Sequence, residues 1–290
     1  LTPASNEPDQ DLALKFFLDD KWRFPIGFNP NYGDIPNSIV FSGAVPIFSF
    51  ISKIFKDYLP YNFHFFPVWI LICFTLQFFF SFKIIYFFTR DYKFSALSAI
   101  FFTLSPILIY RMNVHLSLGA HWLILASFFL DLDKKKGFLF YKKTFLIVLS
   151  SLVHFYFTII LIIMQIFFSF FDYLKNKNFR FFIIENFSIL IILILSMYIT
   201  GYFIIPATDA LGYGFGYYKS NLLTFFDPAP ISNGISWSMV LPDITNTNGE
   251  KEGFAYFGLG IILTFLICII SYLKNLSFKI TINYRYLLLC

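Results

Sequence analysis

Long apolar runs, separated by shorter polar stretches, are the main feature of the sequence. A helix that crosses the hydrocarbon core of a membrane needs about 20 apolar residues. Runs of this kind occupy residues 65–88, 94–110, 116–130, 182–205 and 254–273. The pattern predicts an all-α, polytopic membrane protein in which these segments are membrane helices.

The charge of the intervening segments predicts on which side of the membrane each one lies. Residues 131–143 carry five lysines against two aspartates, and residues 172–181 and 274–285 are also net positive. In contrast, residues 1–37 hold six acidic and three basic side chains, and residues 206–253 hold five and two. Because short loops rich in Lys and Arg stay in the cytoplasm, the two long acidic loops are predicted to be external.

Two further apolar runs need a different explanation under this topology. The run at residues 144–171 is 28 residues long and has basic segments on both sides. It is therefore predicted to form two short helices that enter the membrane and return, with His154 at the outer turn. The run at residues 38–55 contains Pro46, and we expect a re-entrant or interfacial segment there.

The composition agrees with a membrane protein. Of the 290 residues, 58% are hydrophobic and 13% are charged, whereas soluble domains carry about 25% charged residues. The three cysteines imply no disulfide framework, because two lie in apolar runs and one is the last residue. The basic residues form no patch, so a lipid bilayer is the expected partner and a nucleic acid is not.

These segments are predicted to form one membrane domain over residues 1–290. Its parts are a first external loop at 1–64, membrane helices at 65–205, a second large external loop at 206–253, a membrane helix at 254–273, and a cytoplasmic segment with the beginning of another helix at 274–290. The chain begins with Leu1 rather than Met and ends in an apolar stretch, so we expect a piece cropped from a longer protein.

Ionisable residues gather on the predicted outer side. His64, His115, His121 and His154, which are all the histidines of the chain, fall at or near this side, as does Arg111. Arg111 and His115 are four residues apart, on one face of a helix, although Ser105-Pro106 interrupts the helix before them. Arginine with histidines suits an anionic phosphate, while the same residue types also anchor chains at a membrane surface.

The first external loop contains candidate acidic site residues. Glu7, Asp9 and Asp11 lie close together in the sequence, and carboxylates beside a membrane can act as general bases or metal ligands. Asp19-Asp20 is expected to be solvated. The stretch FPIGFNPNYG has the proline, glycine and asparagine residues of an ordered turn region.

The second external loop begins GYGFGYYKSNLLTFFDP. The spacing of a phosphate-binding P-loop is not met. Tyr217, Lys219 and Asn221 are candidates for binding a sugar, on which aromatic faces pack. The alternative is an external lid without chemistry.

Several stretches together resemble a known family. Five groups of residues occur in order between about residue 9 and residue 260. They are FPIGFNPNYG, then SIVFSGAVPIFS, then Ser105-Pro106 with Arg111, His115 and HWLIL, then GYYKSNLLTFFDP, and finally EGFAYFGLG. As an ordered set they resemble an uncharacterised bacterial integral-membrane family that is related to the GT-C membrane glycosyltransferases.

This resemblance implies a GT-C-like helix bundle in the bacterial inner (cytoplasmic) membrane, with its active face outside. GT-C enzymes take a sugar from a polyprenyl-phosphate carrier and have an essential acid in the first external loop. Asp9 or Asp11 would be that acid, although one alignment places Asn6 at its position. The family's usual glycine before the histidine is Val114 here.

The sequence and the resemblance together predict an inverting sugar transfer from a polyprenyl-phosphate donor to a cell-envelope glycan, lipid or protein acceptor. Asp9 or Asp11 would be the general base, and Arg111, His115 and His121 would stabilise the departing lipid phosphate. His154 is a further candidate for binding the substrate, with anchoring at the membrane interface as its alternative. A divalent metal ion, Mg or Mn, is compatible with these residues but not required by them. The alternatives are a transporter or lipid flippase, which the interrupted run at 144–171 favours, and a non-catalytic membrane scaffold.

Overall fold

The structure is a computed structural model that describes residues 7–32, 37–60, 63–133, 138–204, 220–229, 236–244 and 253–274. The chain divides into two compact units. The first unit consists of Leu1–Thr103 and Arg111–Ala210, and the second of Leu104–Tyr110 and Leu211–Cys290.

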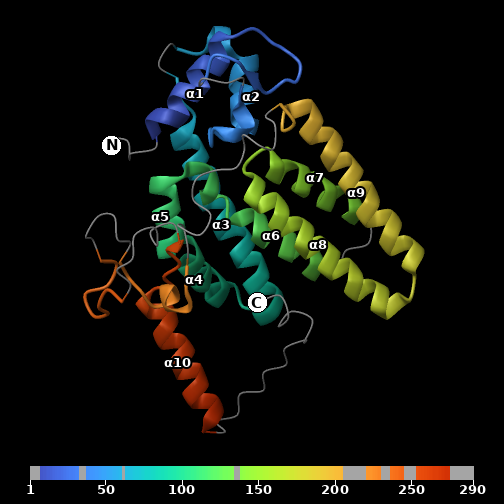
Figure 1. Cartoon of the computed structure of the whole chain (residues 1–290). Helices are drawn as coiled ribbons and strands as arrows, with labels where there is room; N and C mark the ends of the chain where they lie inside the picture. The colour runs from blue at the N-terminus through green and yellow to red at the C-terminus, as the bar shows by residue number, and fades with distance from the viewer. Residues whose placement is uncertain are drawn as a thin grey trace. The chain divides into compact units, whose positions relative to one another are not determined.

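Helices make up both units (Figure 1). The first unit contains α1 (Glu7–Asp19), α2 (Pro46–Ile54), α3 (Phe66–Thr89), α4 (Tyr92–Thr103), α6 (Trp122–Leu132), α7 (Leu139–Ser151), α8 (Phe155–Asn176) and α9 (Phe179–Thr200), with the short 3-10 helices η1 (Ile39–Phe41), η2 (Lys56–Tyr58) and η3 (Leu116–Gly119). The boundary between the units falls within α5 (Pro106–Val114), and the second unit contains η4 (Leu222–Phe225) and α10 (Leu259–Leu273). Strands β1 (Phe28–Asn29) and β2 (Asn37–Ser38) form a short antiparallel pair. The predicted all-α class is confirmed.

Three helices among the described residues are long and apolar enough to cross a membrane. They are α3, α8 and α9, with 24, 22 and 22 residues. Helices α4 and α5 pass the same test as one span that is bent by 42° at the break before Pro106. This break confirms the predicted interruption, because proline lacks the backbone N–H that would continue the helix.

Two predicted membrane helices are shorter than expected. In residues 116–130, η3 ends at Gly119 and α6 begins at Trp122, so α6 has 11 residues. In residues 254–273, Gly258 has a φ of +90° and α10 begins only after it, with 15 residues. At 1.5 Å per residue these helices rise only about 17 and 23 Å, less than the hydrocarbon thickness of about 30 Å.

The long run at residues 144–171 is interrupted at the predicted place. Helix α7 ends at Ser151 and α8 begins at Phe155, with His154 as its N-cap. The Ser150 hydroxyl donates a 3.1 Å hydrogen bond to Thr158 Oγ1 across the turn. The prediction of two short helices is right for α7 and wrong for α8, which is long enough to be a span.

The first predicted external loop is folded. Helix α1, the strand pair, η1 and α2 form a small assembly that we call the first-loop platform (Figure 1). Its core contains Ala13, Phe17, Ile39, Ala44 and Phe50. Helix α2 is too short to cross a membrane and exposes Ile51 and Ile54 while it buries Phe50, as expected for an interfacial helix.

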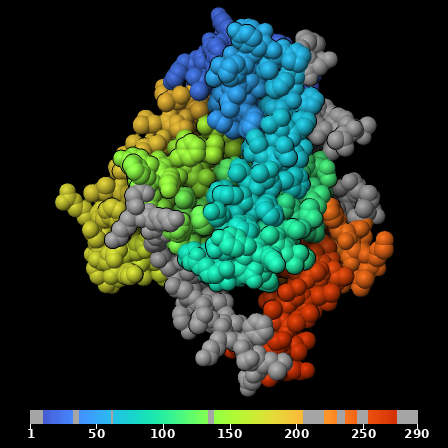
Figure 2. All heavy atoms as spheres, turned by 180° about the vertical axis from the view of Figure 1, so that it is seen from behind, coloured from blue at the N-terminus to red at the C-terminus, as the bar shows by residue number. Residues whose placement is uncertain are grey.

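The first-loop platform contacts two helix ends of the same unit. Ile26 N donates to Ile199 O at 2.9 Å, near the end of α9, and Ile47 N donates to Leu152 O at 2.8 Å, in the turn between α7 and α8. Gly27 permits the first contact, because a Cβ there would lie 2.1 Å from Thr200 O. The view from behind shows the platform, in blue, continuing into α3, in cyan (Figure 2). The predicted external loop and the predicted outer turn therefore lie at one end of this unit.

The second unit has an aromatic core. The ring of Phe254 lies 4.8 Å from that of Tyr110 and 6.2 Å from that of Trp237. Phe225 and Phe257 stack at 4.9 Å, and Phe257 N donates to Phe225 O at 3.1 Å. The motif EGFAYFGLG therefore packs against the segment that holds η4.

Candidate functional site

The three residues predicted to bind the phosphate, together with His154, lie at interruptions between helices. Arg111 is in the last turn of α5. His115 and His121 flank η3, and His154 caps α8. Each of these residues is half-buried, so their polar atoms lie where the helical backbone hydrogen bonds are incomplete.

The structure brings these four residues into one neighbourhood. The His121 ring lies 6.1 Å from the Phe157 ring, and Phe157 N donates to His154 O at 3.1 Å. His121 interacts electrostatically with Arg111, and His154 does so with His115. The turn that holds His154 also contacts the first-loop platform through Leu152. We call Arg111, His115, His121 and His154 the basic cluster.

His154 has a defined structural role. Its Nδ1 accepts a 3.2 Å hydrogen bond from Tyr156 N, which satisfies one of the free N–H groups at the beginning of α8. An imidazole that accepts at Nδ1 while neutral carries its proton on Nε2. Burial, with a smaller effect of the His115 charge, lowers the pKa of His154 to about 4, so this side chain is a neutral donor at pH 7.

His121 is also neutral at pH 7. Burial lowers the pKa of its ring to about 4, and the nearby Arg111 charge acts in the same direction. His121 and His154 therefore supply no positive charge at pH 7. Their contribution to an anion site would be N–H hydrogen bonds, while the guanidinium of Arg111 supplies a fixed charge.

The predicted catalytic acids lie on helix α1 of the first-loop platform. The Asp11 carboxylate forms a 2.6 Å ion pair with Lys15, one turn further along. Between the acids, Gln10 is 6% exposed and lies against Gly43, which fixes the rotation of the helix. The side chain of Asp9 and all of Asn6 lie outside the described part of the structure.

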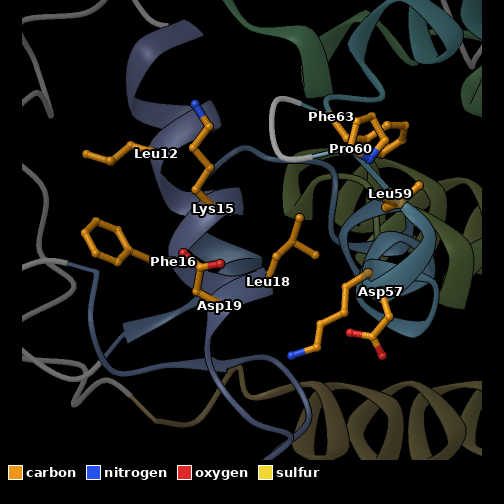
Figure 3. Close-up of a pocket in the computed structure, with 10 residues that line it drawn as sticks. Leu12, Lys15, Phe16, Leu18, Asp19, Asp57, Leu59, Pro60 and Phe63 are labelled. Carbon is orange, nitrogen blue, oxygen red and sulfur yellow. The ribbon is translucent and has the colours of Figure 1, made fainter.

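A pocket of about 570 Å³ lies beside the Asp11–Lys15 ion pair. Lys15, Phe16 and Asp19 of α1 line one side of it (Figure 3). The other side is lined by Lys56, Asp57, Leu59, Pro60 and Phe63. The lining combines charges of both signs with apolar side chains. Such a lining suits an amphiphilic molecule at a membrane surface better than a purely polar one.

The sequence prediction for Asp20 is wrong. Asp20 is 8% exposed and accepts hydrogen bonds from Arg23 Nε at 2.7 Å and Nη2 at 3.1 Å. These bonds lower the pKa of Asp20. The opposite charges at positions 20 and 23 could have indicated this ion pair in the sequence. Only the fold shows that this end of α1 is covered by α2.

Lys53 of α2 is a buried cation that the sequence did not indicate. It is 2% exposed, and its Nζ lies 3.9 Å from the centre of the Phe17 ring and 5.0 Å from that of Trp22. Burial lowers its pKa to about 8, against the attraction of Asp20. This contact with two aromatic rings joins α2 to α1.

The structure tests the second-loop candidates only in part. Tyr217 and Lys219 lie outside the described residues. Asn221 caps η4, because its side chain accepts from Leu223 N at 2.8 Å while Asn221 N donates to Thr224 Oγ1 at 3.0 Å. Asp227, which is 2% exposed, accepts from Ala229 N at 3.1 Å, so it shapes a turn.

The described residues do not form a metal site. No group of three His, Cys, Asp or Glu side chains within them is placed to hold a metal ion. His64 is exposed and stacks on Phe66 at 5.8 Å.

Comparison with known proteins places the chain in a family. Residues 9–290 match the domain of unknown function DUF6311, and the chain belongs to this family. No curated protein and no solved structure matches the chain.

Proposed function

We propose that this protein is a membrane glycosyltransferase that moves a sugar from a polyprenyl-phosphate donor to an acceptor on the outer face of the bacterial inner membrane. One observation carries the proposal. The residues of the basic cluster lie together at one end of the first unit, and the first-loop platform, which bears the acids of α1, contacts the same end. The GT-C-like character of the helix bundle is part of the proposal.

The basic cluster would stabilise the departing phosphate. Arg111 offers a charged, planar set of donors that matches phosphate oxygens. The neutral rings of His121 and His154 would donate through N–H groups without the cost of burying further charges. Positioned donors of this kind contribute about 10²–10³-fold to a rate when they face the charge that forms in the transition state.

The acids of α1 would accept the proton of the acceptor hydroxyl. The acceptor oxygen forms a bond to the anomeric carbon of the sugar, and the bond from that carbon to the lipid phosphate breaks with its electron pair. The proton then resides on Asp9 or Asp11. A general base contributes about 10²–10⁴-fold, and the ion pair with Lys15 at 2.6 Å would hold the Asp11 carboxylate in place.

The pocket beside Lys15 supports an amphiphilic acceptor or donor near these acids (Figure 3). Its Leu12 and Phe16 side chains remain 48% and 37% exposed. These apolar surfaces would be covered if a lipid-linked molecule occupied the pocket.

Sugar transfer from labelled polyprenyl-phosphate sugars, in membranes that hold the full-length protein, tests the proposal. We expect transfer by the wild type, a loss of about 100-fold or more in Arg111→Ala, and a smaller loss in Arg111→Lys. The matched control is Arg180→Ala, an exposed arginine in the first turn of α9, which should behave as the wild type.

The acids are tested in the same assay. The double variant Asp9→Asn, Asp11→Asn should lose about 10²–10⁴-fold at equal abundance in the membrane. Equal transfer by this variant and the wild type would place the base elsewhere. If no donor supports transfer by the wild type, the enzyme proposal fails and a transporter, a flippase or a scaffold replaces it.

A further inference from the structure

We propose that the cavity between α7, α8 and α9 binds a neutral membrane lipid through a single hydroxyl group. The cavity has a volume of about 260 Å³ and is lined by Gln165, Asn186 and eight apolar side chains, among them Ile147, Ile166, Phe187 and Leu190. Two of these helices, α8 and α9, are long enough to span a membrane, so its ligand enters from the bilayer. The proposal does not depend on sugar transfer.

Unsatisfied polar atoms face this apolar cavity. Gln165, near the middle of α8, is 3% exposed, and neither its Nε2 nor its Oε1 has a hydrogen bond of normal geometry among the described residues. A side-chain hydrogen-bond interaction with Glu185 would use one proton of the Gln165 amide, which leaves the second proton and the Oε1 atom for a ligand. In a water-free interior, a polar group without a partner is costly, and a ligand that supplies one is favoured.

Asn186 adds an acceptor to the same wall. Its Nδ2 donates to Ser169 Oγ at 2.8 Å and to Phe182 O at 2.7 Å, which uses both amide protons. Its Oδ1 is buried and has no partner among the described residues. The cavity therefore offers one donor group and two acceptor oxygens.

A hydroxyl matches this set. It can accept a hydrogen bond from Gln165 Nε2 and donate one to Asn186 Oδ1 or Gln165 Oε1. The apolar lining then fits a long hydrocarbon chain.

The charges near the cavity exclude an anionic head group. Glu185 interacts with Asp131, Asp172 and Lys143, and Lys143 already forms a buried 2.7 Å ion pair with Asp131. With Lys143 already paired to Asp131, none of these residues offers a free cation to a phosphate or a carboxylate. The ligand is therefore an uncharged alcohol of the long-chain or isoprenoid class.

Photo-crosslinking to the full-length protein in lipid nanodiscs tests the proposal. The probes are a diazirine-bearing straight-chain alcohol, an isoprenoid alcohol of similar length, and the methyl ether of each. We expect the alcohols to label peptides of α8 and α9 about ten times more than the ethers, because an ether cannot donate a hydrogen bond. A preference for one alcohol would identify the source of the lipid.

The variant Gln165→Leu should reduce labelling by the alcohols to the level of the ethers. Its melting temperature should equal or exceed that of the wild type, because a buried amide oxygen without a partner among the described residues is removed. The matched control is Gln77→Leu on α3, which is also buried but does not line the cavity and should leave labelling unchanged. Equal labelling by alcohols and ethers, or unchanged labelling of Gln165→Leu, would overturn the proposal.

Discussion

The indole N–H of Trp69 donates a 2.8 Å hydrogen bond to the backbone carbonyl of Leu116. Trp69 lies in the first turn of α3 and is 2% exposed, and Leu116 directly follows His115. The bond joins elements 47 residues apart. It fixes the 3-10 helix between His115 and His121, and so the basic cluster depends on a tryptophan outside it.

Replacing this tryptophan should destabilise the protein. Trp69→Phe keeps an aromatic ring but leaves the Leu116 carbonyl without its donor, which costs about 1–3 kcal/mol. Thermal unfolding of the purified protein in detergent measures the effect. Trp237→Phe, at a residue that is 37% exposed, is the control and should change the melting temperature less. Equal shifts would show that the bond to Leu116 does not matter.

A methyl group at Gly27 should separate the first-loop platform from α9. In Gly27→Ala the new Cβ would lie 2.1 Å from the backbone oxygen of Thr200, and backbone cannot move aside cheaply, so we expect a loss of about 1–3 kcal/mol or more. Gly119→Ala is the comparison, because its Cβ would meet the flexible end of Met112. Limited proteolysis of the platform measures the difference, and equal protection in both variants would contradict the contact.

Lys53 should make stability depend on pH in the alkaline range. Its pKa in the folded protein is about 8, against 10.5 for an ordinary lysine. Between these values the unfolded chain binds more protons, so stability rises with pH, by up to about 3 kcal/mol. The unfolding free energies of the wild type and Lys53→Met should therefore diverge in favour of the wild type from pH 8 to 10.5. Parallel curves would show that Lys53 is not buried as a cation.

His154 should make the protein sensitive to mild acid. Its pKa is about 4 in the folded protein and 6.5 for an ordinary histidine, so stability is lost as pH falls from 6.5 to 4, by about 1–3 kcal/mol. His154→Asn keeps an acceptor for the beginning of α8 and should flatten this dependence. Unfolding at pH 5 and pH 7 measures it, and an unchanged slope in the variant would assign the effect to another group.

The proposed orientation can be checked at the two ends of α8. In full-length protein whose cysteines are replaced by alanine, Tyr156→Cys should react with a membrane-impermeant maleimide added outside intact cells, because Tyr156 is 62% exposed beside the predicted outer turn. Lys175→Cys, near the other end of the helix, should react only after the membrane is opened. The reverse pattern would invert the topology.

Much of the helical architecture follows from the sequence. Apolar runs of sufficient length predicted α3 and α9, and Pro106 predicted the break before α5. The interruption at His154 followed from basic segments on both sides of one long run. These features depend on local composition and length, which a single sequence contains.

The site depended on contacts that no local pattern contains. Asp19-Asp20 reads as a solvated pair, yet α2 covers Asp20 and brings Lys53 against Phe17 and Trp22. Likewise, the sequence places His121 and His154 near the predicted outer face, but it does not show that burial makes them neutral at pH 7. The charge state of an ionisable group is set by the solvent and the charges around it. The sequence by itself thus determined where most of the helices lie and which residue types stand at their ends. Only the tertiary structure decided which of those residues meet, because burial and proximity arise when distant segments pack.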